Sequence, residues 1–456
     1  MYKKILIASL ALIAGLASCK KDDPTPSPNP PSGLTIDGVA STLEFYQLDT
    51  AHLSVAGVAK DAAAKAVWVV NGAKAAEGAT FDFTTAHPGK YEVTLTVDGK
   101  SAKHTYTVAP RFSEGAFLLN EGNSGNETGS LTYIHPSKKL VIDQAYYHVN
   151  GTKLGNVCQD LAFENDQIYI LSQLGPKNGG EGLLTIARSN SLEKVKVYND
   201  EALAQSTPTH IAVLRDHIYI RTERDGILRG SSEGGFTPIA GTKKALKQRM
   251  AQIGERIFAL TKDNKILMIQ GAQVIRELST TPAQLTGIAV SHDGKLWVST
   301  TSPNAILKVD PTPDNFVALD THILDKSISA TGPQSWERTT SSAFFAHGDK
   351  LYFTGQSSVI YCHDFATSKT SQVIDVKTID GVGTSANKYY NSLGVDPATG
   401  ELYYAAFENY STYNKKNVTM VLKADGTKLL LKEQVNSFPA GFFFIPNAAS
   451  RTGANQ

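Results

Sequence analysis

The chain has 456 residues, which exceeds one ordinary domain, so two or more folded parts are expected. Basic and acidic residues nearly balance at a formal net charge of +1, which argues against a nucleic-acid-binding surface or a strongly charged partner. Three cysteines exclude a disulfide framework, whereas 37 glycines, 18 tyrosines and 18 phenylalanines suit an all-β protein rich in turns.

The first 18 residues have the pattern of an export signal. Two lysines precede an apolar run from Ile5 to Leu16, which is too short to span a bilayer as a stable helix. The run leads to Cys19, and the segment from Leu16 to Cys19 resembles a bacterial lipobox, whose cysteine sulfur receives a diacylglycerol before cleavage. We therefore expect residues 1–18 to be a lipoprotein signal peptide and Cys19 to be lipidated. An ordinary signal peptide with a chance cysteine is the alternative.

Residues 19–33 have the composition of an extended tether. Lys21, Asp22 and Asp23 follow the lipidated cysteine and resemble the surface-export signal of Bacteroidetes lipoproteins, although a solvated charge run is the alternative. Residues 24–31 are rich in proline, which fixes φ and removes backbone donors, so this part is semi-rigid. The expected location is the outer membrane, facing the cell exterior, with the lipid as the only membrane contact.

Residues 34–109 alternate apolar and polar side chains between regular turn signals. Asn71-Gly72 and Asp98-Gly99 are dipeptides typical of tight hairpin turns. Trp68, the Asn71-Gly72 turn and the stretch from Pro88 to Val93 resemble the PKD and immunoglobulin-like modules of bacterial surface proteins. We expect a small β-sandwich that serves as a spacer.

Beyond Pro110 the chain repeats one pattern six times. Each repeat has a short apolar strand, a polar turn and a second strand that carries an aromatic residue. Consecutive aromatic residues lie 39 to 55 positions apart, and repeats of this length with several strands predict the blades of a β-propeller. The six aromatic residues are Tyr169, Tyr219, Phe258, Trp297, Tyr352 and Tyr403.

The two ends of this region each hold half of a further repeat. Phe117 to Leu119 is an aromatic strand with no apolar strand before it, and Gly441 to Phe444 is an inner-type strand with nothing after it. Joining them gives a seventh blade and removes the free edge of an open ring. The prediction is an all-β protein in which a seven-bladed propeller spans 111–447, followed by a disordered tail at 448–456.

The repeat pattern resembles the YncE-like and NHL-type propellers. The stretch from Phe117 to Asn123, followed by Gly129 to Leu131, resembles a Bacteroidetes family of lipoprotein propellers known mainly as a domain of unknown function. Some members of that family capture cobalamin at the cell surface for a TonB-dependent transporter. The resemblance therefore implies cobalamin or a related corrinoid as the bound ligand and such a transporter as the partner.

Motifs for catalysis or metal binding are missing from the sequence. It has no HExxH motif, no Gly-x-Ser-x-Gly elbow and no glycine-rich phosphate loop. An enzyme is still an alternative, because two carboxylates that are distant in the sequence can come together in the folded chain. We expect no catalytic residue, no metal and no cofactor, apart from the possible cobalamin ligand.

Binding residues are expected on one face of the propeller. Loops between second and third strands, and between a fourth strand and the next inner strand, share that face, and loops on rigid scaffolds carry function. Their aromatic, amide and arginine side chains suit a large ligand with a polar rim or a protein partner, although loop packing is the alternative for each. The candidates are Asn123, Tyr146, Tyr147, His148, Arg221, Arg224, Trp336, Arg338, Tyr389, Tyr390, Tyr410 and Tyr413.

The leading hypothesis is therefore a surface lipoprotein that binds a small-molecule nutrient and passes it to an outer-membrane transporter, without nucleic-acid partners. Two alternatives stay open. A non-catalytic adhesion or assembly module would present a broad, flat aromatic face to a protein or glycan. A propeller enzyme would need carboxylates or histidines that converge at the mouth of the channel.

Overall fold

The computed structural model describes residues 33–39, 44–281, 283–328, 344–355, 357–388, 392–435 and 437–446. Within these ranges no helix is both long and apolar enough to cross a membrane. Outside them lie the predicted signal peptide, the predicted tether up to residue 32, the predicted tail and several predicted functional residues. Those residues are Cys19, Lys21, Asp22, Asp23, Trp336, Arg338, Tyr389 and Tyr390.

The chain divides into two compact units. Among the described residues, the smaller comprises 33–39, 51–83 and 91–106, and the larger comprises 44–50, 84–90 and those that follow Tyr106. The first β-region contains a three-stranded sheet, order β1-β3-β6, and a five-stranded sheet, order β2-β8-β7-β4-β5. Its elements are β1 (Thr35–Asp37), β2 (Phe45–Tyr46), β3 (Thr50–Ala56), α1 (Lys60–Ala63), β4 (Val67–Val70), β5 (Ala73–Glu77), β6 (Thr80–Thr84), β7 (Gly89–Val97) and β8 (Lys100–Ala109).

The predicted hairpin turns of this region are confirmed. Asn71 and Gly72 join β4 to β5 with φ angles of 48° and 82°, and Asp98-Gly99 joins β7 to β8 in the same left-handed region. Two such residues give a turn whose twist matches the flanking strands. Trp68 on β4 is fully buried, and its indole Nε1 donates to the Gly78 carbonyl at 2.9 Å. The core of the smaller unit is thus built around the tryptophan that the sequence singled out.

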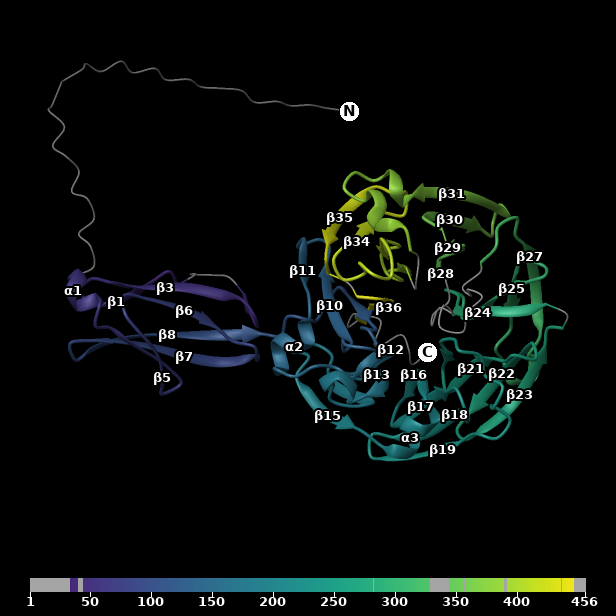
Figure 1. Ribbon diagram of the computed structural model, residues 1–456, viewed down its shortest axis with the longest axis horizontal. Coiled ribbons are helices and arrows are strands. Elements are labelled where there is room, and N and C mark those ends of the chain that lie inside the picture. The colour runs from purple at the N-terminus through teal and green to yellow at the C-terminus, as the bar shows by residue number, and fades with distance from the viewer. Residues whose placement is uncertain are drawn as a thin grey trace, which may run out of the picture. The chain divides into compact units, whose positions relative to one another are not determined.

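The larger unit contains seven four-stranded sheets within the described residues, each built mainly from consecutive strands. Figure 1 shows these sheets standing around a common centre, the arrangement of a β-propeller. The first four sheets consist of β36 (Pro439–Phe444) with β9 (Ala116–Asn120), β10 (Ser130–His135) and β11 (Leu140–Ile142); β12 (Asn156–Glu164), β13 (Gln167–Gly175), β14 (Leu184–Arg188) and β15 (Lys194–Tyr198); β16 (Pro208–Leu214), β17 (His217–Thr222), β18 (Gly226–Ser231) and β19 (Gly234–Pro238); and β20 (Ala251–Ile253), β21 (Arg256–Leu260), β22 (Lys265–Gln270) and β23 (Gln273–Ser279).

The other three sheets follow the same order from the inside outward. They consist of β24 (Gln284–Val290), β25 (Leu296–Thr301), β26 (Ala305–Val309) and β27 (Ala318–Ile323); β28 (Phe344–His347), β29 (Lys350–Thr354), β30 (Val359–Asp364) and β31 (Lys369–Asp375); and β32 (Leu393–Val395), β33 (Leu402–Phe407), β34 (Asn417–Leu422) and β35 (Lys428–Glu433). All six repeat aromatics lie on second strands, namely β13, β17, β21, β25, β29 and β33, and all are buried. The repeat pattern therefore located these strands correctly.

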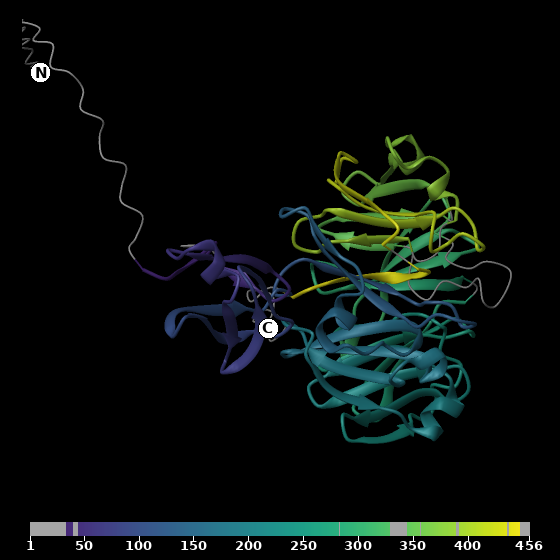
Figure 2. The same ribbon diagram turned by 60° about the vertical axis from the view of Figure 1, so that its left-hand side comes forward.

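The two ends of the propeller region share one sheet, as the sequence predicts. Strand β36 pairs antiparallel with β9, so that Gly441 lies opposite Leu119 and Phe443 opposite Phe117. Figures 1 and 2 show the yellow β36 beside the blue strands at the start of the propeller. Strand β9 therefore has a partner on both sides, β10 and β36. An unpaired inner edge would expose backbone donors and acceptors, and this pairing removes that edge.

The core of the larger unit lies between neighbouring sheets. Strands such as β9 and β33 are buried at every residue, because both faces of each sheet are covered by the next sheet. One layer brings Tyr169 and Ile186 of one sheet against Ile211 and Ile220 of the next. These strands therefore need continuous runs of apolar residues rather than alternating apolar and polar ones.

Short helices occupy several connections that the sequence analysis treated as loops. Helix α2 (Ala145–Asn150) precedes β12, and α3 (Glu201–Ser206) precedes β16. The Asp200 side chain caps α3 by accepting the Leu203 N–H at 2.8 Å. Four 3₁₀ turns are also present in the described residues: η1 (Lys177–Gly179), η2 (Pro313–Asn315), η4 (Val376–Thr378) and η5 (Gly383–Ala386).

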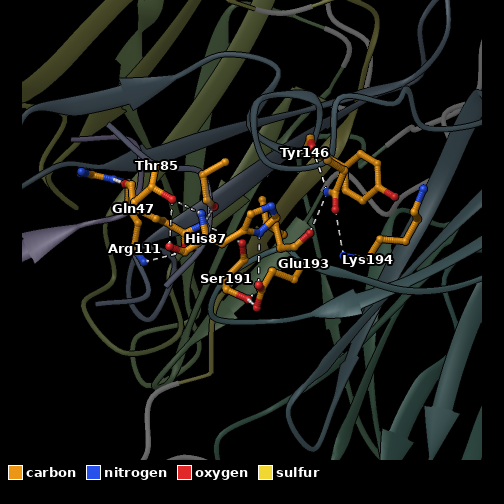
Figure 3. A network of polar contacts seen from close by, with 11 residues as sticks. Gln47, Thr85, His87, Arg111, Tyr146, Ser191, Glu193 and Lys194 are labelled. Atoms are coloured by element: carbon orange, nitrogen blue, oxygen red, sulfur yellow. Dashed lines mark hydrogen bonds and ion pairs between the residues drawn. The ribbon is translucent and has the colours of Figure 1, made fainter. Parts of the chain in front are cut away.

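Segments 44–50 and 84–90 belong to the larger unit through polar contacts with the turn after β14 (Figure 3). Gln47 Nε2 donates to the carbonyls of Ala86 and Ser191 at 2.8 and 2.9 Å, and its Oε1 accepts the Arg111 N–H at 3.1 Å. His87 Nδ1 lies 3.2 Å from Glu193 Oε1. The buried amide of Gln47 is thus satisfied at both ends. The sequence analysis placed a single boundary at Pro110, but segments 44–50 and 84–90 also belong to the larger unit, so the chain passes between the units more than once.

Candidate functional site

We define the loop face of the propeller by connections 121–129, 143–155, 176–183, 408–416 and 434–438. These join second to third strands or lead to a new inner strand, so antiparallel pairing brings them to the same side of the sheets. Loop 121–129 packs directly on β12, because a Cβ on Gly129 would lie 2.3 Å from Cys158 Sγ. The Gly129 N–H donates to the Gly155 carbonyl at 2.9 Å. The first part of this face therefore rests on a rigid strand.

A pocket of about 140 Å³ opens on the loop face between loop 121–129 and the α2 connection. Tyr147 is 43% exposed at this pocket, whereas Tyr146 is buried below it. The Tyr146 hydroxyl donates to Glu181 Oε2 at 2.9 Å, and burial together with this carboxylate raises the tyrosine pKa. The lining consists of residues 126–131, Gln144, Tyr146, Tyr147, Lys153 and Leu154.

Glu127, which lines the pocket, also holds a second part of the loop face. Its Oε2 accepts hydrogen bonds from the Tyr413 hydroxyl at 2.9 Å and from Ser437 Oγ at 2.8 Å. The Asn123 N–H donates to the Glu127 carbonyl at 3.1 Å. Burial and the Glu127 carboxylate raise the pKa of Tyr413 to about 12. One carboxylate thus links connections from the start and the end of the propeller.

Beside Glu127 lies an aromatic cluster made of Phe407, Tyr410, Tyr413 and Phe438. The Tyr413 and Phe438 rings stack with centroids 4.0 Å apart, and Phe407 meets Phe438 edge to face at 5.4 Å. Tyr410 packs on Phe407 at 5.5 Å yet is 40% exposed, whereas Tyr413 is only 7% exposed. The cluster therefore has a buried support and one partly exposed residue, Tyr410, over whose ring Lys388 Nζ lies at 5.7 Å.

Other candidates lie apart from this cluster. Arg221 is 1% exposed, with its Nη2 donating to the Ala245 carbonyl at 3.0 Å and its Nη1 lying 3.1 Å from Glu223 Oε1. It supports the fold rather than the surface. His148 and Arg224 are exposed, but neither lines the pocket. The structure therefore brings together Asn123, Tyr146, Tyr147, Tyr410 and Tyr413 around Glu127, and it leaves His148, Arg221 and Arg224 outside.

An ion pair between a buried Asp160 and a partly buried Arg249, which we call the central pair, joins inner strands of the propeller. Asp160 on β12 accepts a hydrogen bond from Arg249 Nε at 3.0 Å and from the Ile211 N–H of β16 at 3.1 Å. Arg249 Nη2 donates to the Ala440 carbonyl on β36 at 3.4 Å, and its Cζ lies 4.0 Å from the centre of the Phe443 ring. Three inner strands are thus tied together by two side chains.

The closing strand is shaped around this arginine. Gly441 has a φ of 138°, a backbone conformation that favours glycine, and a Cβ there would lie 2.4 Å from Arg249 Nη2, so a larger residue would also displace the guanidinium. Burial raises the pKa of Asp160 to about 6, with Arg249 opposing the shift, and burial lowers the pKa of Arg249. The central pair therefore stabilises the fold by linking inner strands of different propeller sheets.

Four of these residues were not candidates from the sequence. Glu127 lies in a predicted long loop, and its carboxylate among amides was a usable signal. Asp160 directly precedes a predicted inner strand, which also marks it. Arg249 and Phe438 carry no local signal, because their roles come from contacts across the ring. Among the described residues no group of three His, Cys, Asp or Glu side chains is placed to hold a metal ion.

Comparisons with known proteins support the fold. A family model described as a domain of unknown function (DUF5074) matches residues 114–445. The search of the curated proteins found no match. Among solved structures, a quinonprotein alcohol dehydrogenase-like protein from Bacteroides thetaiotaomicron is similar at 15% identity and a TM-score of 0.59, covering 90% of this chain and 98% of that one.

Two further solved structures are more distant. A functionally unknown protein from Desulfotomaculum acetoxidans has 13% identity and a TM-score of 0.48, with 73% of this chain and 99% of that chain covered. BamB from Moraxella catarrhalis has 12% identity and a TM-score of 0.36, with 60% and 76% covered. At these identities the likeness of the first structure concerns the fold alone.

Proposed function

The chain belongs to the DUF5074 family, whose domain has no assigned function, and from that membership we propose that it is a lipid-anchored, non-catalytic binding protein that captures a nutrient on its loop face. Seven four-stranded sheets support a count of seven blades. The sandwich of the smaller unit is a PKD-like or immunoglobulin-like spacer in this proposal. Cys19 carries the lipid, and Lys21, Asp22 and Asp23 direct the protein to the outer surface of the outer membrane.

The observation that carries the proposal is the exposure of two tyrosines on either side of Glu127. Tyr147 stands at the pocket and Tyr410 on the aromatic cluster, at 43% and 40% exposure. Large exposed rings on a rigid, hydrogen-bonded support are typical of binding surfaces, because little side-chain freedom is lost when a partner docks. Polar groups at the pocket, such as Lys153 and Gln144, would fix the orientation of the ligand.

The ligand we propose is a corrinoid, on the strength of the family resemblance in the first propeller strands. A pocket of about 140 Å³ is smaller than the 300–1,000 Å³ that usually holds a whole small molecule. It would therefore receive one polar side group, while the larger body of the ligand lies over Tyr147 and Tyr410. A ligand held so openly can be passed on to a TonB-dependent outer-membrane transporter, the partner in this proposal.

Calorimetric titration tests the proposal with the mature chain, in which Cys19→Ser removes the lipid. Cyanocobalamin should give saturable heat at micromolar protein. Tyr147→Ala and Tyr410→Ala should each weaken binding about tenfold, because each removes a ring from the contact surface. His217→Ala, at an exposed turn between first and second strands, is the matched control on the opposite side.

Two results would contradict the proposal. If cyanocobalamin gave no heat, a corrinoid would be ruled out as the ligand. If the two tyrosine variants and His217→Ala weakened cyanocobalamin binding equally, the loop face would be ruled out as the binding surface.

A further inference from the structure

The outermost strand of each propeller sheet is an edge with unpaired backbone groups. Within the described residues, β11, β15, β19, β23, β27, β31 and β35 each pair with a strand on one side only. Such edges invite pairing with another chain, and proteins usually block them with charged side chains, especially Lys, with Pro, with β-bulges, or with very short strands.

Six of the seven outer strands carry such a block. Strand β11 has only three residues and no exposed side chain. The other five have basic residues, or glycine with proline: Lys194 and Lys196 on β15, Gly234, Gly235 and Pro238 on β19, Arg276 on β23, Lys369 on β31, and Lys428 and Lys432 on β35.

Strand β27 is the least protected of the seven. It has a β-bulge between Ala318 and Asp320 and one exposed charge, Asp320, but its sequence from Ala318 to Ile323 contains no Lys, Arg, Gly or Pro. Leu319 and Ile323 are 48% and 65% exposed on the same face of the strand, and Val317 just before it is 41% exposed. These are three of the seven large apolar side chains that are exposed in the described part of the chain. The strand stands at the rim of the propeller (Figure 1).

The same strand is complementary to itself when it is paired antiparallel about Thr321. Leu319 then faces Ile323 of the other copy, and Asp320 faces His322. Within one chain Asp320 Oδ2 already lies 2.9 Å from His322 Nε2, so the two side chains form a matched polar pair. Centring the pairing on Asp320 would instead place two carboxylates opposite each other, which is unfavourable. One register is therefore favoured by both apolar and polar contacts.

We propose that a second copy of this chain pairs with β27, edge to edge, around a two-fold axis through Thr321. The result is a continuous eight-stranded sheet made from the β24-β25-β26-β27 sheets of two copies. A two-fold contact suits a self-complementary strand, because each copy offers the same residues to the other. Dimer formation uses the rim and is independent of any ligand on the loop face.

Cysteine cross-linking tests the register. In the mature Cys19→Ser chain, Thr321→Cys places two thiols opposite each other on the axis. Paired Cα atoms in antiparallel strands lie about 4.5–5.5 Å apart, within the range that a disulfide spans. Thr237→Cys, on the exposed outer strand β19 of another sheet, is the matched control. Ser371 on β31 is unsuitable for this purpose, because it lies opposite the native Cys362 and a thiol there could pair within the chain. The native Cys158 is buried and Cys362 is half-buried, so the parent chain gives the background.

The expected result is a disulfide-linked dimer with Thr321→Cys, at a yield at least about tenfold above Thr237→Cys. Leu319→Cys or Ile323→Cys alone should cross-link poorly, whereas a mixture of the two should cross-link well, since each faces the other. Equal yields from Thr321→Cys and Thr237→Cys would overturn the proposal.

Sedimentation at tens of micromolar gives an independent readout. The parent chain should sediment at twice the protomer mass, and Thr321→Lys should sediment as the protomer, because two lysines would meet on the axis. Ser371→Lys should leave the dimer intact, and thermal melting of both variants checks that they fold. A parent chain that is monomeric at this concentration, as would follow if another segment of its own chain covered β27, would contradict the proposal.

Discussion

The central pair and the loop face have different roles in this propeller. Asp160 and Arg249 lie among inner strands, where they connect β12, β16 and β36. Tyr147 and Tyr410 lie in the same kind of strand connections as many buried residues, yet each is about two-fifths exposed. The centre of this propeller therefore supplies cohesion, while in the proposed function the loop face supplies the contact surface.

Glu127 explains why the loop face can be both exposed and rigid. Its carboxylate holds Tyr413 and Ser437, and its carbonyl accepts the Asn123 N–H, so two connections far apart in the sequence are fixed together. The exposed Tyr410 rests on rings that this network immobilises. A substitution in a supporting residue should therefore lower the free energy of unfolding, whereas a substitution in an exposed ring should leave it nearly unchanged.

The largest expected effect comes from breaking the central pair. Arg249→Met keeps most of the apolar stem against Phe443 but leaves the buried Asp160 without its cation. The free energy of unfolding should fall by about 3–5 kcal/mol, as measured by urea denaturation, because an uncompensated buried charge is costly. The double variant Asp160→Asn with Arg249→Met should recover most of this loss, since Asn can still accept the Ile211 N–H. No recovery in the double variant would mean that the arginine acts through packing alone.

The pH dependence of stability tests the role of Asp160 in the central pair. Burial raises the pKa of Asp160 to about 6, above the value of about 3.9 for an unfolded chain. From about pH 4 to 6 the folded chain keeps a proton that the unfolded chain has released, so this group lowers stability as pH rises. The loss should reach about 3 kcal/mol near pH 6, and it should be absent in Asp160→Asn. Urea denaturation across this range checks it, and parallel curves for parent and variant would refute it.

The smallest expected effect concerns the support of the loop face. Tyr413→Phe removes the hydroxyl that donates to Glu127 but keeps the stack on Phe438. The free energy of unfolding should fall by about 1–2 kcal/mol, because Glu127 loses one of its two donors. Tyr147→Phe, at an exposed ring, is the control and should stay within about 0.5 kcal/mol. If both variants behave alike, the hydrogen bond to Glu127 contributes nothing to the fold.

The sequence was sufficient to predict the regular part of the molecule. Buried second strands repeat an aromatic residue at similar spacing, as Tyr219 and Phe258 illustrate, because each sheet fills the same space between two neighbours. The pairing of Gly441 with Leu119 was predictable for a related reason, since each end of the region held half of a repeat. Periodicity carries this information without any knowledge of distant contacts.

The candidate site was predictable only in outline. The sequence placed Tyr146, Tyr147 and Arg221 on the same face, but it could not show that Tyr146 and Arg221 turn inward and are buried. Which side chain of a connection faces solvent depends on partners such as Glu181 or Ala245, which lie on other segments. Contacts across the ring, such as that of Arg249 with Ala440, have no signal in local sequence at all.

The pairing of β9 with β36 also sets the order of events when the chain is made. Asn120 and Ser437, which are hydrogen-bonded in the finished protein, are 317 residues apart, so the ribosome releases the first strand of the ring long before its partner. Pairing between such distant segments is slow, and until it occurs β9 presents an open edge to neighbouring chains. The ring thus matures only after the last strand emerges, and the loss of a few residues near Phe444 would disrupt the first sheet synthesised rather than the last.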